Sequence, residues 1–339
     1  MSPLLPQPPP FIPPPDPAIK KGVRKASLIT SGVIVLLYAA IFRFAFTMDL
    51  FRQAGGVVSL SFVISVPFAC GALSVAIGRW LGSDNWVIQA VFIPVAALLL
   101  GLVICVVTRI EAVICVIMAA PILVVACVLG GITAHLLLPR NNPKPKFYCS
   151  LIVCLPLLSS YAEGLCTWPT ETKSITNTIT IHAPAERIWP EITSVRAIDP
   201  KSLRNSWIYQ VGFPRPIAAT LDRAGVGGIR TATFERDVSF FEVVTDWREN
   251  QRLAFSIHAD PAFIPHTAFD QHIIVGGRFY DVLDGIYEIE PVSAGVCRLH
   301  LTSHHRLSTR FNSYATWWSV RIMNEIQGTI LEVIRSRAE

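Results

Sequence analysis

The chain has 339 residues, of which 52% are hydrophobic and only 16% are charged, against about 25% charged residues in an ordinary soluble protein. Residues 163–339 hold 20 of the 24 acidic and 18 of the 29 basic residues, so this part has a net charge of −2. The overall charge of +5 is therefore due to the excess of basic residues before residue 163. Basic residues are therefore not clustered on the part that reads as a folded domain, which excludes a nucleic-acid-binding footprint.

The chain opens with a proline-rich leader. Residues 1–17 contain nine prolines, and such a composition favours polyproline-II-like, disordered chain over packed structure. We expect a disordered leader over residues 1–26.

Five apolar segments follow within residues 27–162. A helix needs about 20 apolar residues to cross a bilayer. The first four segments are long enough, whereas the fifth is short and contains Pro156 and three serines. The sequence therefore predicts an α-helical membrane bundle of four or five spans, at about 28–46, 57–78, 86–108, 112–138 and 147–162.

Lysine and arginine in the short loops set the expected orientation. With five spans, eight of these residues lie on the side of the N-terminus and three on the other side. The N-terminus is thus expected in the cytoplasm. The C-terminal domain is periplasmic if the fifth segment spans, and cytoplasmic if it does not.

Residues 170–339 read as an α+β domain. "SITNTITI" places Ile175, Ile179 and Ile181 on one face with period two, as in a half-buried strand, and Pro184 then suits the first turn of a short helix. A long amphipathic helix is expected over 312–336, with its apolar stripe formed by Ala315, Trp318, Ile322, Ile326, Ile330 and Val333. Further strand-like runs lie at 206–212, 227–235, 240–248, 252–259, 284–292 and 295–305. The economical packing is a curved antiparallel sheet around the closing helix.

These residues resemble a known superfamily. "ITIHAPAERIWPEIT", "GVGGIRTATFERDVSFFEVVTDWRENQRLAFSI" and "GIYEIEP…CRLHLTSHHR", followed by the closing helix, are similar to the helix-grip (SRPBCC) fold of START lipid-transfer domains, the birch-pollen allergen and polyketide cyclases/dehydrases. The resemblance covers about residues 174–337. The long segment 260–281 and the multi-span region depart from its pattern. It implies a cup-shaped interior for apolar ligands.

Aromatic residues on the expected strands and helix are the candidates for lining such a ligand cavity, although buried aromatics are also ordinary core residues. Trp317, with Val320 and Leu331, is expected on the outer side of the last helix. The cavity candidates are Trp207, Tyr209, Phe234, Phe241, Trp247, Phe255, Tyr287 and Trp318.

Few residues suggest catalysis. His300, Thr302 and His304 alternate along one strand and share a face, as Glu242 and Asp246 do on another. On an inward face, His300, His304 and Asp246 would suit proton transfer in a cyclase or dehydrase. On an outward face they are solvated surface residues, which is the interpretation we favour.

No cofactor or metal is expected. The histidines and aspartates at 258, 260, 266, 270 and 272 have ligand chemistry but match no metal motif, and nucleotide-binding motifs are absent from the sequence. Cys166 and Cys297 either form a disulfide or are two separate thiols.

Three functions are compatible with this organisation. The leading hypothesis is a non-enzymatic, membrane-anchored module that binds a lipid or another hydrophobic small molecule, with membrane lipids as its other partner. The alternatives are a cyclase/dehydrase-type enzyme on an apolar substrate and a structural or sensory protein that docks a partner. The architecture and the resemblance together suggest a bacterial inner-membrane protein.

Overall fold

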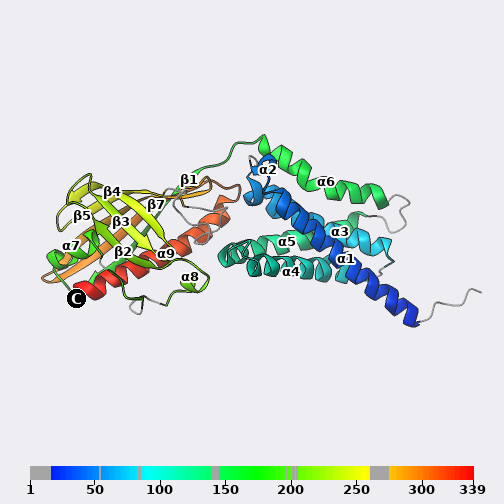
Figure 1. Ribbon diagram of the computed structural model, residues 1–339, viewed down its shortest axis with the longest axis horizontal. Helices are drawn as coiled ribbons and strands as arrows, with labels where there is room; N and C mark the ends of the chain where they lie inside the picture. Colours follow the sequence, from blue (N-terminus) through cyan, green and yellow to red (C-terminus); the bar gives the residue numbers. More distant parts are fainter. Residues whose placement is uncertain are drawn as a thin grey trace, which may run out of the picture. The chain divides into compact units, whose positions relative to one another are not determined.

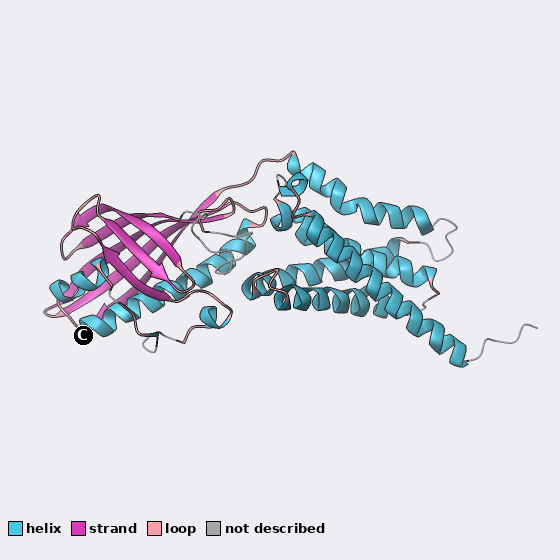
Figure 2. Cartoon of the chain, in the orientation of Figure 1, coloured by secondary structure: helices cyan, strands magenta, loops and turns pink. Residues whose placement is uncertain are grey.

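The computed structural model describes residues 17–52, 55–82, 85–138, 145–195, 197–200, 203, 205–259 and 275–339. The chain divides into two compact units. The membrane unit comprises the chain up to Phe44 together with Ile64–Gly101 and Ile122–Leu157. The grip unit comprises Ala45–Val63, Leu102–Pro121 and Leu158–Glu339. Helices dominate the first half of the chain, and the sheet belongs to the second (Figures 1 and 2).

The regular secondary structure described before Glu171 is entirely helical. In chain order the helical segments are α1 (Pro17–Ala45), α2 (Asp49–Arg52), η1 (Gly56–Val58), η2 (Ser61–Ser65), α3 (Val66–Trp80), η3 (Ile88–Phe92), α4 (Ile93–Val107), α5 (Val113–Leu137) and α6 (Pro145–Gly164).

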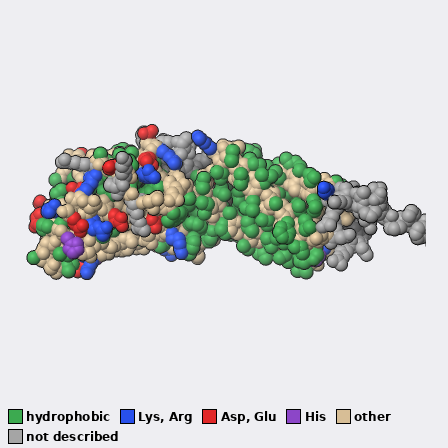
Figure 3. Space-filling model, turned by 90° about the horizontal axis from the view of Figure 1, so that it is seen from below, with side chains coloured by type: hydrophobic (Ala, Val, Ile, Leu, Met, Phe, Trp, Pro, Cys, Tyr) green, Lys and Arg blue, Asp and Glu red, His purple; other side chains and the backbone are tan. Residues whose placement is uncertain are grey.

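Four of these helical stretches are long and apolar enough to cross a membrane: Lys25–Ala45, Ser61–Trp80, Ile88–Val107 and Val113–Leu137. They coincide with the first four predicted spans. On the face shown in Figure 3, hydrophobic side chains predominate over the helical part of the chain, whereas charged side chains gather over the sheet-bearing part. The fifth predicted segment lies in α6, whose apolar stretch Cys149–Gly164 is shorter than a span. The orientation of the chain stays a prediction.

The predicted leader is partly helical. Helix α1 begins at Pro17, so residues 17–26 belong to it, while residues 1–16 lie outside the described part. Proline suits the first helical position because its missing N–H has no partner there in any case, and the alanine, lysine and arginine residues that follow are good helix formers.

Glycines allow close helix crossings in the membrane unit. A Cβ atom at Gly71 would overlap the carbonyl oxygen of Cys127, and one at Gly130 would overlap that of Phe68. Small residues let helix backbones approach closely, which is how apolar helices pack well where burial from water offers little driving force.

The grip unit contains one seven-stranded sheet in the order β1-β7-β6-β5-β4-β3-β2, with every neighbouring pair antiparallel. The strands are β1 (Glu171–Ile181), β2 (Pro216–Leu221), β3 (Ile229–Phe234), β4 (Val238–Arg248), β5 (Arg252–His258), β6 (Tyr280–Ser293) and β7 (Val296–Leu307). Two short helices, α7 (Ala185–Thr193) and α8 (Trp207–Gln210), separate β1 from β2, and α9 (Asn312–Ala338) closes the chain. This curved antiparallel sheet with a long C-terminal helix is the helix-grip arrangement that the sequence predicts (Figure 1).

Irregularities in the strands assist the curvature of the sheet. Register shifts occur in β4 between Val244 and Asp246 and in β6 between Val282 and Asp284. Bulges of this kind bend a strand and increase its twist. At Gly285 a Cβ would lie 2.6 Å from the Phe255 ring, so a residue without a side chain is needed for that ring to cross the strand.

The apolar core of the grip unit lies mainly under the C-terminal half of α9. Helix α9 contacts β1, β7 and α7, and Leu331, Ile334 and Ala338 join a core cluster with inward residues of β1 and β4–β7. Leu331 is almost fully buried, so it does not belong to the predicted outer patch, whereas Trp317 is 47% exposed as expected.

The strand predictions were wrong for two neighbouring segments. Residues 206–212 contain the short helix α8, because the Ser206 hydroxyl accepts a hydrogen bond from the Ile208 N–H as an N-cap and Gly212 (φ 102°) ends the turn. The edge strand β2 was not expected, because "PIAATL" is short and weakly alternating.

Replacing Gly130 by alanine is expected to destabilise the membrane unit, because the new methyl group would push α5 away from the Phe68 carbonyl. Over-packing of this kind costs about 1–3 kcal/mol. The matched control is Gly32→Ala in α1, where the nearest atom would be 3.8 Å away and alanine improves helix propensity. Thermal unfolding of the full chain in detergent measures both variants, and equal unfolding temperatures would contradict the crossing.

Candidate functional site

The alternation of β7 determines which of its side chains face α9. The inward residues are Cys297, Leu299, Leu301, Ser303, His305 and Leu307, all of them buried. His300, Thr302 and His304 share a face, as predicted, but it is the outer face. The apolar leucines occupy the inner face, and period two then places every intervening residue outside.

Both predicted catalytic histidines are tied to surface partners. His300 contacts the Thr178 hydroxyl at 2.8 Å and a Glu290 carboxylate oxygen at 3.1 Å. His304 contacts the Asp284 carboxylate at 2.7 Å. These side chains therefore do not face the interior.

Asp246 is also directed outward. It forms ion pairs with Arg252 at 3.0 Å and Arg248 at 3.5 Å. Glu242, which shares its predicted face, is instead buried inside. The register shift after Val244 changes the phase of β4, so the expected pairing of Glu242 and Asp246 on one face was wrong.

His305 is the histidine that the fold places inside. Its side chain is 0% exposed, and its Nε2 atom lies 3.0 Å from the Ser319 hydroxyl of α9. That hydroxyl donates in turn to the Thr316 carbonyl at 3.2 Å. Burial lowers the pKa of His305, and the nearby His304 and Lys173 lower it further, so the ring is held neutral.

Three polar atoms of β7 and the first two turns of α9 are buried without a hydrogen-bond partner among the described residues. They are His305 Nδ1, Thr316 Oγ1 and Trp318 Nε1. Buried polar atoms are paired in the great majority of cases, so a group of such atoms in one stretch of structure calls for an explanation.

The buried polar side chain of Gln327, further along α9, has hydrogen-bond partners. Gln327 donates to the Ser303 hydroxyl at 2.9 Å and to the Ile175 carbonyl at 3.4 Å, and its own oxygen accepts from Asn177 at 2.7 Å. The unpaired atoms are therefore confined to the N-terminal part of α9 and do not extend along the whole polar stripe.

A second buried polar group spans three strands. Arg230 of β3 pairs with Glu242 of β4, donates to the Thr193 carbonyl at 3.2 Å and hydrogen-bonds Tyr287 of β6. Burial raises the pKa of Glu242, against the opposing effect of Arg230, and raises that of Tyr287 to about 12. The Arg230 guanidinium also lies 5.3 Å from the centre of the Phe255 ring. This group is fully paired, which indicates a structural role.

The predicted cavity aromatics lie in different surroundings. Phe255 and Tyr287 belong to the buried core, and Trp247 packs against that core, with its ring 5.0 Å from Trp189. Phe234 packs in a neighbouring cluster. Phe241 is 45% exposed; it points outward because it alternates with the inward Glu242.

The remaining aromatics flank α9. The rings of Trp207 and Trp318 lie 6.4 Å apart, and the Tyr209 hydroxyl hydrogen-bonds Thr329. Burial raises the pKa of Tyr209, and the bond to Thr329 opposes the shift. The short helix α8, which the sequence presented as a strand, thus places both of its aromatics against the closing helix.

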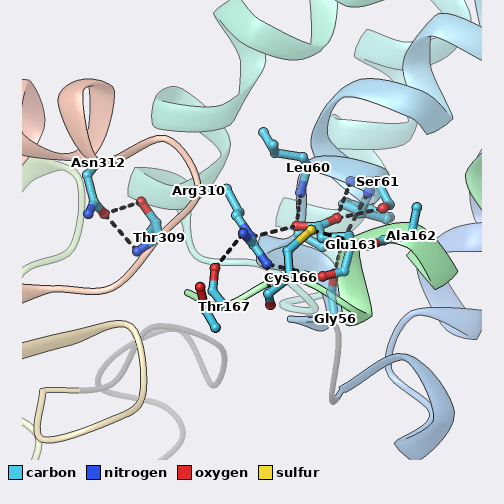
Figure 4. Close-up of polar contacts among 12 residues, drawn as sticks. Gly56, Leu60, Ser61, Ala162, Glu163, Cys166, Thr167, Thr309, Arg310 and Asn312 are labelled. Atoms are coloured by element: carbon cyan, nitrogen blue, oxygen red, sulfur yellow. Dashed lines mark hydrogen bonds and ion pairs between the residues drawn. The ribbon is translucent and has the colours of Figure 1, made fainter. Parts of the chain in front are cut away.

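A polar junction holds the start of α9 (Figure 4). The Glu163 carboxylate accepts from the backbone N–H groups of Leu60 and Ser61, each at 2.9 Å, and from the Ser61 hydroxyl at 2.6 Å. Arg310 donates to the carbonyls of Thr167 (2.6 Å), Cys166 (2.8 Å) and Glu163 (3.1 Å). Its guanidinium also lies 4.8 Å from the Trp168 ring centre. We call this set of contacts the Glu163–Arg310 junction.

The sequence-based expectations on metals and thiols have different outcomes. The metal-type residues at positions 260, 266, 270 and 272 lie outside the described part, and His258 contacts Ser256 at 3.2 Å. Among the described residues, no group of three or more metal-ligating side chains occurs. Cys166 is an exposed free thiol and Cys297 a buried one, so they are separate.

Comparisons with known proteins place the likeness in the fold of the C-terminal half. No protein-family model and no curated protein sequence matches the chain. Truncated norcoclaurine synthase from Thalictrum flavum is 14% identical, covering 50% of this chain and 96% of that one, with a TM-score of 0.31. An uncharacterised Bacillus thuringiensis protein is 11% identical over 48% of this chain and 97% of its own, also with a TM-score of 0.31. A conserved Geobacillus kaustophilus protein is 11% identical over 49% and 95%, with a TM-score of 0.31. Likenesses of this extent say nothing of activity.

Replacing Arg230 by methionine is expected to lower the free energy of unfolding of the grip unit by about 3–5 kcal/mol, because it leaves the Glu242 charge buried without its partner. Arg298→Met is the matched control, since Arg298 is half-exposed and pairs with the exposed Glu290; exposed pairs contribute about 0–1 kcal/mol. Denaturant unfolding followed by tryptophan fluorescence compares the two. Equal losses of unfolding free energy in the two variants would show that the buried pair stabilises the fold no more than the exposed pair does.

Replacing Arg310 by lysine keeps the charge but removes the planar fork that reaches three carbonyls. We expect a loss of about 2 kcal/mol, since each lost hydrogen bond contributes about 1 kcal/mol. Arg321→Lys serves as control, because Arg321 is exposed and stacks on Trp317. Thermal unfolding of the full chain measures the difference. An unchanged unfolding temperature for Arg310→Lys would contradict a stabilising role for the junction.

Proposed function

We propose that the grip unit binds an apolar small molecule or lipid between α9 and the sheet, without chemical conversion, and that the membrane helices keep it beside the bilayer. The observation that carries the proposal is His305: a fully buried side chain, in a largely apolar interior, with a ring nitrogen that has no partner among the described residues. A bound molecule would supply the missing contact.

The inward side chains near the start of α9 and at Ser303 of β7 are smaller than those at the other end of α9. Ala315 and Ser319 face inward from the helix, and Ser303 faces inward from β7. The large apolar residues of the core cluster instead gather around Leu331 and Ile334. An ordinary core is closely packed and leaves few voids. Small inward side chains together with unpaired polar atoms therefore favour a binding region over an ordinary core.

The apolar helices explain why such a unit would be joined to a membrane bundle. An apolar ligand is concentrated in the bilayer, and covalent linkage raises the effective concentration of the binding unit near that source. His300 and His304 were candidate residues for a cyclase or dehydrase. Both are hydrogen-bonded on the outer face of β7 and do not face the interior, so they do not support that alternative. Binding without conversion is therefore the simpler function.

A photoactivatable lipid probe tests the proposal. Diazirine-bearing hexadecanol would be added to the full chain in phosphatidylcholine nanodiscs, and the cross-linked peptides identified by mass spectrometry. We expect labelling of inward residues of β7 and α9. Labelling of the apolar helices measures the amount of probe in the bilayer and serves as the internal reference.

Filling the interior should abolish that labelling. Ala315→Phe places a large ring on the inward face of α9, and we expect labelling of β7 to fall at least about tenfold, equivalent to 1.4 kcal/mol. Ser313→Phe is the matched control, since Ser313 is exposed on the same helix. Labelling that is absent from the wild-type interior, or unaffected by Ala315→Phe in a folded protein, would reject the proposal.

A further inference from the structure

We propose that the start of α9 is a lipid-contacting surface, where the Trp317 ring lies among the head groups of the bilayer and the Arg321 guanidinium binds the phosphate groups of anionic lipids. The proposal concerns the outer side of α9 and does not depend on what the interior binds. It rests on the contact between Tyr314 and α5, on the composition of the exposed stripe of α9 and on the pairing of Trp317 with Arg321.

The Tyr314 hydroxyl connects the start of α9 to an apolar helix that is long enough to cross a membrane. It donates to the Met118 carbonyl of α5 at 2.6 Å, and both residues belong to the grip unit. Pro121 lies within α5, three residues after Met118. A proline lacks the N–H of a helical hydrogen bond, so the turn before it offers carbonyl groups to donors from outside the helix.

The length of α5 relates this contact to the bilayer. The helix has 25 residues, which is about 37 Å, so it exceeds a hydrocarbon core of about 30 Å by about 4 Å at each end. Met118 lies about 7 Å from the start of α5, which is close to the boundary between hydrocarbon and head groups. Trp317 follows Tyr314 by less than one helical turn and is therefore held near the same boundary.

The exposed stripe at the start of α9 has the composition of a membrane-interface surface. Its exposed residues are spaced by four, four and three positions, and they are Ser313, Trp317, Arg321 and Asn324. None of the four is acidic, and Trp317 is 47% exposed. Tryptophan is enriched where a bilayer meets water, because its ring is apolar and its N–H is polar, and basic side chains are attracted to anionic lipids.

Further exposed apolar side chains lie at the end of α6. Tyr161 and Leu165 are each 74% exposed. The carbonyls of Glu163 and Cys166, beside them in the chain, accept from Arg310, which lies two residues before α9 begins. The end of α6 and the start of α9 are thus held by one arginine, and both carry an exposed aromatic residue, as an interfacial belt does.

The Arg321 side chain is positioned beside Trp317. Its guanidinium lies 3.5 Å from the centre of the Trp317 ring and donates to the Trp317 carbonyl at 3.1 Å. A guanidinium has five N–H donors, so this contact leaves others for a phosphate group. Glu325, the nearest acidic residue along α9, instead accepts from the Ser206 hydroxyl at 2.7 Å. The phosphate of a lipid beside Trp317 is therefore the anion that Arg321 would bind.

Fluorine NMR of the full chain in phosphatidylcholine nanodiscs tests the contact. The eight tryptophans would be replaced by 5-fluorotryptophan, with each resonance assigned by its loss in a Trp→Phe variant. A lipid with a nitroxide on its head group should broaden the Trp317 resonance as strongly as that of Trp80, which is 70% exposed at the end of an apolar helix. The resonance of the buried Trp189 should stay sharp. A water-soluble gadolinium chelate reports exposure to water in the same sample.

Spin-labelled phosphatidylglycerol and phosphatidylcholine, in equal amounts, test the role of charge. At low ionic strength we expect the phosphatidylglycerol to broaden the Trp317 resonance about fivefold more, which corresponds to about 1 kcal/mol for one basic side chain at an anionic surface. Arg321→Gln should remove this difference, whereas Arg321→Lys keeps the charge and should retain it. Arg335→Gln, in the last turn of α9, is the matched control and should also retain it.

The outcomes separate the two parts of the proposal. A Trp317 resonance that the gadolinium chelate broadens, but that the lipid nitroxide broadens no more than it does Trp189, would overturn the lipid contact. Equal broadening by the two lipids, or a preference that survives Arg321→Gln, would overturn the role of Arg321 and leave the contact of Trp317. The unfolding temperature establishes that each variant is folded, and the wild-type comparison of the two lipids needs no variant.

Discussion

The phase of β7 is the constraint on which the rest of the grip unit depends. This strand lies between β1 and β6 and contacts α9, so each of its side chains either enters the interior or reaches the outer surface. A one-residue shift of phase would exchange the two sets completely. Leu299 and Leu301 fix the phase by burial, and His305 is then inside while His300 and His304 are outside. Two of the three histidines in this strand have carboxylate partners on the outer surface, and the third becomes the one buried imidazole of the strand.

Much of this arrangement could be predicted from the sequence, and the histidines show where the prediction stopped short. The alternation of leucine with histidine and threonine in "CRLHLTSHH" already places His305 on the leucine face. The burial of His305 could therefore have been predicted, but the prediction named His300 and His304 instead. The outward position of Asp246 could not be predicted from the sequence, because the register shift in β4 leaves no trace in an otherwise continuous strand pattern. The helix α8 was missed for a similar reason: four residues are too few for either period to be distinguished.

The buried ion pair shows a second limit of sequence reasoning. Arg230 and Glu242 lie 12 residues apart along the chain and become opposite partners only through the β3–β4 register. A buried pair is weak evidence for stability, because desolvation of two charges offsets much of their attraction. Here Tyr287 and the Thr193 carbonyl satisfy further donors of Arg230, so each strand and α7 contribute one group. Such a network fixes the relative register of its elements more than it adds free energy.

The position of the buried His305–Ser319 contact depends on how the start of α9 is held. Asn312 accepts from the Thr309 N–H at 2.7 Å and donates to the Pro169 carbonyl at 3.2 Å. Tyr314 donates to the Met118 carbonyl at 2.6 Å. Together with the Glu163–Arg310 junction, these contacts fix the first turn of α9. Ser319 lies seven residues after Asn312, about two helical turns further on, so these contacts also fix the hydroxyl group that hydrogen-bonds His305 Nε2. A binding group presented by a strand and an anchored helix is held more closely than one on a loop.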